Sequence, residues 1–270
     1  MRLSLRHIIP MFAVIILTAC SGDAEMKDAG QGAFTFGITT DGMNIEVVTR
    51  TAHQLTANEA ADYNITLNQG DETIWSKRYA DIIDADRTQP LGSGYTVSAE
   101  NCSTDEAENA NEGWGQRRFA GKSDPFVIVS KETTLVMVNC SMYNAGLCVL
   151  FDKSFTDYFS EYAVTTDDLR ALKFNATNGA EFDAEHQMIS GSVAYYNTDD
   201  SGLHSVRVVI SASAGWDGTV RLARDLTLQR GKITRLRVRL TGSEPVEGNI
   251  GLSITADDFL EGEGEEIILE

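Results

Sequence analysis

The sequence predicts an all-β protein made of two tandem antiparallel β-sandwiches. From Gly32 onward, short runs of alternating apolar and polar residues are separated by Gly, Asn and Asp, which is typical of half-buried antiparallel strands. The same kind of pattern restarts after Asn144. Parts of the two halves also match at a nearly constant offset, which indicates duplication of a unit of immunoglobulin size.

Residues 1–19 have the composition of a secretory signal peptide. Arg2 and Arg6 precede an apolar run from Ile8 to Ala19, and the small residues at its end directly precede Cys20. A charged start, an apolar middle and a small-residue cleavage site define such a peptide. The run is also shorter than the roughly 20 residues that cross a bilayer. We expect cleavage before Cys20.

The stretch Leu17-Thr18-Ala19-Cys20 resembles the lipobox of bacterial lipoproteins. The resemblance implies acylation of Cys20, so that the membrane is a partner through a lipid anchor. Ser21 implies release to the outer membrane, and the acids after it loosely resemble the export tag of Bacteroidetes surface lipoproteins. We therefore expect a lipid-anchored outer-membrane protein exposed on the cell surface. The alternative is an ordinary signal peptide followed by a chance cysteine.

The remaining chain divides into three predicted parts. Residues 20–31 are small and charged, which suits a flexible tether. Residues 32–142 form the first predicted sandwich, and residues 143–270 form the second, which includes C-terminal strands. The chain contains 40 Asp and Glu against 22 Lys and Arg, so nucleic acid and anionic lipid headgroups are unsuitable partners.

The strands are predicted from alternation, and one short helix is expected near residues 57–61. In the first half the runs are residues 32–40, 43–49, 62–68, 73–81, 94–101, 124–130 and 133–140. In the second half they are residues 145–152, 161–167, 169–176, 188–197, 205–213, 225–231 and 233–241, with one or two further strands after Gly242.

The internal repeat relates strands of the two halves. The segment 126–138 matches 226–238, and 63–66 matches 162–165. In Arg235–Leu240 the apolar residues must share one face and the arginines the other. We expect these arginines to pair with carboxylates on neighbouring strands, a ligand patch being the alternative. Cys140 aligns with the inward-facing Leu240, which favours a buried disulfide or a buried thiol.

Three cysteines remain once Cys20 carries lipid. An oxidising compartment allows one disulfide, and we predict Cys102 with Cys140 because both lie at the ends of strands of one domain. Cys148 is then a small strand residue. No cofactor or metal is predicted, because no cysteine pair has ligand spacing and the histidines are scattered. Asn197, Asp199 and Asp200 offer oxygen ligands that suit calcium, but a solvated turn is the favoured interpretation of these residues.

The segment Pro90–Ala99, with its Gly-x-Tyr turn, resembles the turn-strand motif of prealbumin-like sandwiches. With Phe119–Phe126, Asn139–Met142 and Asn144-Ala145, it is similar to an uncharacterised family of Bacteroidetes surface lipoproteins with prealbumin-like and fimbrillin-like β-sandwich domains of unknown function. The second half departs from it, because no Gly-x-Tyr turn precedes Val206. The resemblance implies a surface β-protein and transfers no catalytic residues.

The chain shows no sequence signature of an enzyme. It lacks a His-Glu-x-x-His helix, a phosphate-binding Gly-rich loop and a Gly-x-Ser-x-Gly elbow. Adjacent acids such as Asp167-Asp168 point in opposite directions along a strand, whereas glycoside hydrolysis needs two carboxyls facing one sugar. We predict no catalytic residue.

Trp114 and Trp216 are the candidate ligand-binding residues, because each is flanked by glycine at nearly equivalent points of the two halves. An exposed tryptophan with Asp, Asn and Glu nearby suits stacking on a sugar ring. The alternative is that each indole closes the open end of its own sandwich. Trp75, inside an alternating run, is predicted to lie in the core.

These features predict a non-catalytic surface lipoprotein that acts in adhesion or in surface, fimbria-like assembly, with other surface proteins as partners. The alternative is a glycan-binding lipoprotein of a polysaccharide-uptake system that uses Trp114 and Trp216. A hydrolase requires a cleft that gathers distant acids.

Overall fold

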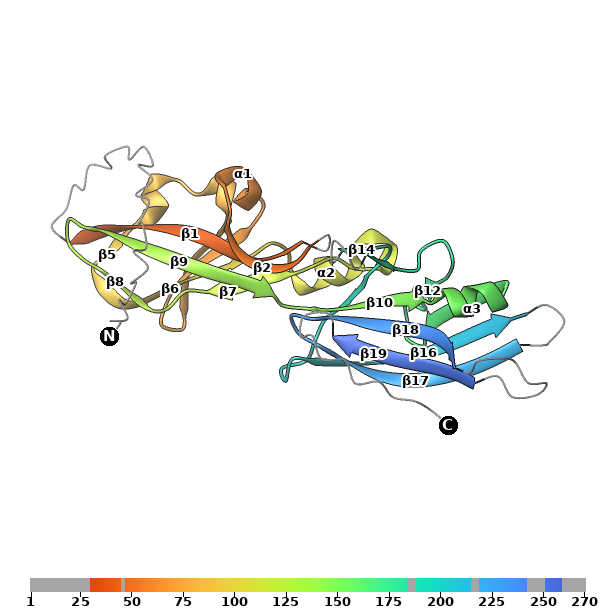
Figure 1. Cartoon of the computed structure of the whole chain (residues 1–270). Coiled ribbons are helices and arrows are strands. Elements are labelled where there is room, and N and C mark those ends of the chain that lie inside the picture. The colour runs from red at the N-terminus through yellow and green to blue at the C-terminus, as the bar shows by residue number, and fades with distance from the viewer. Residues whose placement is uncertain (1–29, 45–46, 184–187, 215–218, 242–250, 259–270) are drawn as a thin grey trace, which may run out of the picture.

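A computed structural model describes residues 30–44, 47–183, 188–214, 219–241 and 251–258. Two β-sandwiches lie end to end in it, joined by the short connector Tyr143-Asn144 (Figure 1). Strands dominate the described residues, which confirms the predicted all-β class of two tandem sandwiches. No helix within these residues has the length and apolar character needed to span a membrane.

Nine strands build the first sandwich. They are β1 (Gln31–Asn44), β2 (Val47–Gln54), β3 (Asn64–Gln69), β4 (Glu72–Arg78), β5 (Thr88–Pro90), β6 (Gly92–Glu100), β7 (Phe119–Lys122), β8 (Phe126–Ile128) and β9 (Thr133–Met142). The sheet order is β2-β1-β9-β7-β6-β3-β4, with β5 on β1 and β8 on β6.

This single sheet encloses one apolar core. Phe34 on β1, Ile65 on β3, Val97 on β6 and Val138 on β9 belong to one buried cluster, and none is more than 1% exposed. Since side chains alternate along a strand, the opposite faces of these strands remain for solvent. Because β7 pairs with both β6 and β9, it connects the two layers that face this core.

The connections of the first sandwich contain short helices. They are α1 (Ala57–Ala60), η1 (Tyr79–Asp81), η2 (Asp84–Arg87), α2 (Thr104–Asn109) and η3 (Asn111–Gly113), the η elements being 3-10 turns. The predicted helix near residues 57–61 is confirmed as α1, where Thr56 and Glu59 form a reciprocal capping box. The helix α2 was not predicted, although Ser103 and Glu106 form the same kind of box.

The second sandwich consists of two four-stranded sheets, β15-β10-β18-β19 and β12-β11-β16-β17, with a separate β13-β14 pair. Its elements are β10 (Ala145–Phe151), α3 (Lys153–Tyr158), β11 (Glu161–Thr166), β12 (Lys173–Phe174), β13 (Glu181–Asp183), β14 (Met188–Ser190), β15 (Ala194–Tyr196), β16 (Leu203–Ser213), β17 (Thr219–Gln229), β18 (Ile233–Thr241) and β19 (Gly251–Asp258). Leu147, Val164, Val208 and Leu236 meet in its core with no measurable exposure.

The two halves share one feature that alternation did not predict. The first strand of each half pairs in parallel with a late strand, β1 with β9 and β10 with β18. Part of the repeat noted in the sequence lies on these late strands, where Val136 and Val138 are buried in β9 as Leu236 and Val238 are in β18. Parallel pairing brings together strands that no hairpin joins, so local patterns do not reveal it.

The expected pairing of the β18 arginines with carboxylates is confirmed at Arg237. Arg237 on β18 places Nε 2.8 Å from Oδ1 of Asp152, which directly follows the neighbouring strand β10. In the turn Gly92-Ser93-Gly94-Tyr95, Gly94 has φ +79°, and the buried Tyr95 donates its hydroxyl to the carbonyl of Pro90 at 2.9 Å.

Candidate functional site

The connector between the sandwiches is held by one buried amide. Asn144 is 1% exposed. Its Oδ1 accepts from the backbone N–H of Arg118 at 3.2 Å, and its Nδ2 donates to the carbonyl of Gln116 at 2.7 Å. Its own carbonyl accepts from Gly231 N–H in the second sandwich at 3.0 Å. A two-residue connector with these bonds has little freedom to bend.

A loop of the first sandwich, residues 110–117 and here called the junction loop, reaches into the second sandwich. Its backbone has positive φ at Asn111, Glu112, Gly113 and Gly115 (52°, 58°, 89° and 78°), a region that non-glycine residues occupy at a cost. A β-carbon on Gly115 would lie 2.8 Å from the carbonyl oxygen of Tyr195. Glycine is therefore required where the two sandwiches touch.

The junction loop places Trp114 against the core of the neighbouring sandwich. Trp114 is partly buried and packs on the second sandwich's core cluster. Its ring meets that of the fully buried Phe174 edge to face, with centroids 5.0 Å apart and planes at 87°. Its carbonyl accepts from Tyr195 N–H at 2.7 Å. The sequence left open that each indole closes the open end of its own sandwich. Trp114 instead packs against the other sandwich.

Arg170 holds the junction loop from the opposite side. Its Nη1 donates to the carbonyls of Gly113 at 3.1 Å and Tyr195 at 2.8 Å. Its guanidinium carbon lies 3.8 Å from the ring centroid of Tyr196. With a side chain only 14% exposed, this cation–π contact contributes about 2 kcal/mol. Arg170 thus links the loop of one sandwich to a strand of the other.

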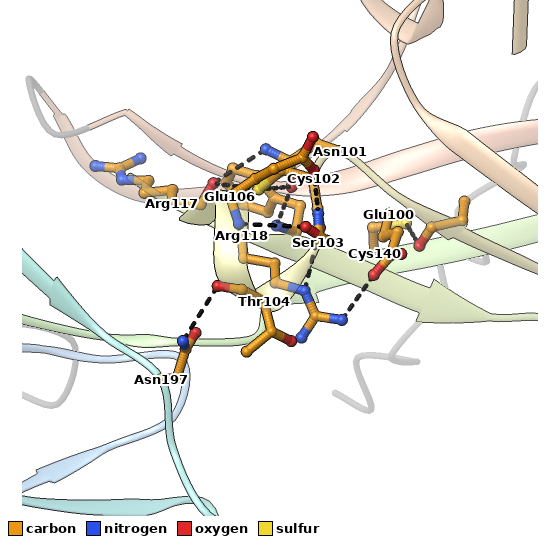
Figure 2. A network of polar contacts seen from close by, with 12 residues as sticks. Glu100, Asn101, Cys102, Ser103, Thr104, Glu106, Arg117, Arg118, Cys140 and Asn197 are labelled. Carbon is orange, nitrogen blue, oxygen red and sulfur yellow. Dashed lines mark hydrogen bonds and ion pairs between the residues drawn. The ribbon is translucent and has the colours of Figure 1, made fainter. Parts of the chain in front are cut away.

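The helix α2 makes a further contact across the junction. Figure 2 shows Asn197 of the second sandwich reaching Thr104. Its Nδ2 donates to the carbonyl of Thr104 at 3.2 Å and to Oε2 of Glu108 at 2.8 Å. The helix itself is fixed by Ser103 and Glu106, whose backbone and side-chain hydrogen bonds lower the pKa of Glu106.

Arg118 organises the same network on the side of the first sandwich (Figure 2). Its Nη2 binds Oε2 of Glu100 at 2.6 Å and its Nε donates to the carbonyl of Cys102 at 3.2 Å. The guanidinium carbon lies 5.1 Å from the ring centroid of Tyr143. Arg230, from the turn between β17 and β18, approaches the same ring to 4.2 Å. One aromatic ring in the connector therefore receives a cation from each sandwich.

The structure differs from the predicted disulfide. Cys102, Cys140 and Cys148 are buried free thiols. Cys140 Sγ donates to the carbonyl of Ala99 at 3.5 Å, whereas Cys102 Sγ lies 3.9 Å from the carbonyl of Arg117. The two sulfurs thus contact different acceptors, and burial raises the pKa of Cys102, which disfavours the reactive thiolate. The expectation of a buried thiol at Cys140 is confirmed.

Two open grooves lie outside the buried junction. The first, here called the junction groove, has a volume of about 460 Å³ on the outer face of β3, β6 and β7, and Tyr143 borders it. The second, of about 440 Å³, lies among β11, β12 and β16 of the second sandwich. Its lining includes Ser213 and Thr219. Trp216 falls between them in sequence but lies outside the described residues.

The structure describes some of the remaining predicted residues and leaves others outside its described ranges. Cys20 lies outside the described residues, so its lipidation stays a prediction. Trp75 is partly buried against the first core and donates Nε1–H to the carbonyl of Asp86. Asp199 accepts from Ser201 and from the Leu203 N–H, which supports the turn interpretation over calcium. Among the described residues, no group of three His, Cys, Asp or Glu side chains is arranged to hold a metal.

The sequence did not identify Asn144, Arg170 or Tyr143 as junction residues. Their partners lie far away in the chain, as with Arg170 and Gly113, 57 positions apart. The two predicted sandwiches abut at residues 142 and 143, so the sequence carried no local signal for a junction site.

Together these features define a two-sandwich β-protein whose best-formed polar site is the junction between the sandwiches. A family model for a domain of unknown function (DUF4493) matches residues 30–270. The chain belongs to that family. No curated protein matches it.

Several solved structures resemble the chain at low identity. The fimbrial anchor protein Mfa2 from Porphyromonas gingivalis shares 9% identity, with 86% of this chain and 99% of that one covered and a TM-score of 0.43. A fimbrial assembly protein from Parabacteroides distasonis shares 10%, with 88% and 100% covered and a TM-score of 0.45. These values are too low to assign an activity to this chain.

Proposed function

We propose that the chain is a non-catalytic surface protein of adhesion or surface assembly, in which the two sandwiches form a stiff spacer. The observation that carries the proposal is the reciprocal junction. Trp114 of the first sandwich packs against the core of the second, while Arg170 of the second binds the loop that carries it. A spacer that holds a binding surface away from a membrane needs this stiffness.

Lipid attachment at Cys20 would fix one end of this spacer to the outer membrane. The support is the lipobox-like sequence that ends at Cys20. Several acyl chains give effectively permanent anchoring, because each buried methylene contributes about 0.8 kcal/mol. We expect a fatty-acid analogue to label the wild-type protein and not Cys20→Ala. Equal labelling of the two proteins would remove the anchor from the proposal without affecting the spacer.

The lining of the two grooves favours a non-catalytic role. The junction groove contains the single carboxylate Glu100, and the second groove the single carboxylate Glu161, among its described lining residues. Glycoside hydrolysis by the common routes needs two carboxyls about 5 to 9.5 Å apart. The glycan alternative built on tryptophans is weakened as well, because Trp114 is occupied by the second core.

The stiffness can be measured between two exposed positions, Ile83 in the first sandwich and Lys153 in the second. Spin labels on Ile83→Cys and Lys153→Cys should give one narrow distance distribution by pulsed electron paramagnetic resonance. The three native thiols among the described residues are buried and react slowly, and the labelled protein begins after Cys20. Trp114→Ala with Asn144→Ala should broaden it, whereas Trp75→Ala, inside one sandwich, should not. A broad distribution in the wild type would overturn the spacer.

A further inference from the structure

The junction groove has an ordered polar floor. Paired residues on adjacent strands form two rows across β3, β6 and β7. One row is Thr66, Ser98 and Lys122, and the other is Asn64, Glu100 and Ala120. All six line the groove, while Ile65 and Ala99, which lie between the two rows on β3 and β6, are buried in the core. The floor is therefore held by the rigid sheet, which favours precise binding.

The junction groove is net positive, whereas the whole chain is strongly negative. The chain has a formal net charge of −18, yet the groove contains Arg118 and Lys122 against the single carboxylate Glu100. Glu100 is already paired with Arg118 at 2.6 Å. Lys122 is exposed, and no partner for it is found among the described residues. The groove therefore offers an uncompensated cation to a ligand that carries a carboxylate.

One end of the groove offers an apolar surface. Tyr143 is 40% exposed, and its backbone N–H donates to the carbonyl of Arg118 at 2.7 Å. Arg118 and Arg230 lie within 5.1 and 4.2 Å of the ring centroid, so the ring is fixed before any ligand arrives. An aromatic ring beside hydroxyl and amide groups suits a sugar, which has C–H faces as well as hydroxyls.

We propose that the junction groove binds an acidic sugar, a hexuronate unit within a longer glycan. The carboxylate would lie at Lys122, and the hydroxyls would bind Asn64, Thr66, Ser98 and Glu100. Tyr143 would contact the ring. A volume of about 460 Å³ lies within the roughly 300–1,000 Å³ of small-molecule sites. This glycan site is a proposal separate from the stiff spacer, and failure of one proposal would leave the other standing.

Titration calorimetry of the whole chain with an oligogalacturonate and with the matching neutral oligogalactoside tests the site. We expect the acidic glycan to bind at least tenfold more tightly, because a hydrogen bond to a charged group is worth roughly a factor of ten or more. The advantage should shrink as salt rises. Equal affinity for both glycans, or no binding of either, would overturn the proposal.

Lys122→Met is the decisive variant, because it removes the charge and keeps most of the side-chain length. It should lower affinity for the acidic glycan roughly tenfold and leave the neutral glycan unaffected. Lys131→Met is the matched control, because Lys131 is an exposed lysine in the turn between β8 and β9 and lines neither groove. Equal loss in both variants would mean general charge attraction, which contradicts a site at Lys122. The spin-label distances should stay unchanged in both, which separates loss of binding from loss of the spacer.

Discussion

The two sandwiches share a strand plan but differ in how their cores are completed. The first encloses its core with its own strands and helices, and the residues of that cluster all precede Ser141. The core of the second also contacts Trp114, which the chain supplies about thirty residues before the second sandwich begins. The comparison teaches that a duplicated unit need not stay independent, because one copy can come to depend on a loop of the other.

The largest expected effect comes from removing that loop's indole. Trp114→Ala should destabilise the second sandwich by about 3 kcal/mol, since truncation of large aromatic core residues costs roughly 3–5 kcal/mol and this ring is only partly buried. Hydrogen exchange followed by mass spectrometry should show lost protection in β11, β12 and β16, with the first sandwich unchanged.

Trp75→Ala is the matched control for that measurement. Trp75 is also partly buried, but it packs on the first core. Its loss should therefore reduce protection in the first sandwich and leave the second intact. If Trp114→Ala instead weakened only the first sandwich, the dependence inferred between the two would be refuted.

A smaller effect is expected at a feature that only the first sandwich has. Tyr95→Phe removes the hydrogen bond to the carbonyl of Pro90 and should cost about 1 kcal/mol, the usual net value of one such bond. Urea unfolding followed by exchange should place the loss in β5 and β6. An equal loss of protection in the second sandwich would show that the two cores are more strongly coupled than the junction contacts imply.

The sequence predicted the strands of each sandwich better than it predicted the contact by which the second sandwich depends on the first. Alternation placed Leu236 and Val238 inward, and the repeat related them correctly to Val136 and Val138. Strand boundaries were less secure, since the predicted run 43–49 spans the end of β1 and the start of β2. Trp114 was selected as a candidate ligand-binding residue, whereas in the structure it packs against the second core. Its partner Phe174 lies sixty positions away, in a strand of two residues, and no local periodicity connects them.

The lipid anchor can be predicted from the sequence alone, whereas the junction groove can be found only from the structure. Cys20 is readable because a signal peptide is a contiguous pattern, yet it lies outside the described residues. The junction groove is the reverse case. Asn64, Glu100 and Lys122 are unremarkable in the sequence, and only the register of β3, β6 and β7 brings them together.

The smallest expected effect is a pH dependence confined to the second sandwich. His204 lies beside Tyr196, with ring centroids 4.7 Å apart, and burial lowers the pKa of His204 below its usual value. Arg170 also disfavours the charged ring, while Asp168 and Glu108 oppose this. Unfolded histidine binds a proton near pH 6.5, whereas the folded residue stays neutral to lower pH.

The unfolded state therefore binds more protons just below about pH 6.5, so the free energy of unfolding should fall as pH drops from there to the folded pKa. His204→Phe should abolish this step, because it keeps an aromatic partner for Tyr196 and removes the titrating group. His53→Asn, on the exposed surface of the first sandwich, should retain it. The carboxyls with lowered pKa, such as Glu106, act only nearer pH 4, so urea midpoints measured between pH 5 and 7 isolate the histidine. If His204→Phe shows the same fall in the free energy of unfolding below about pH 6.5, another group causes that fall. The interior of the second sandwich near the junction would then be insensitive to mild acid.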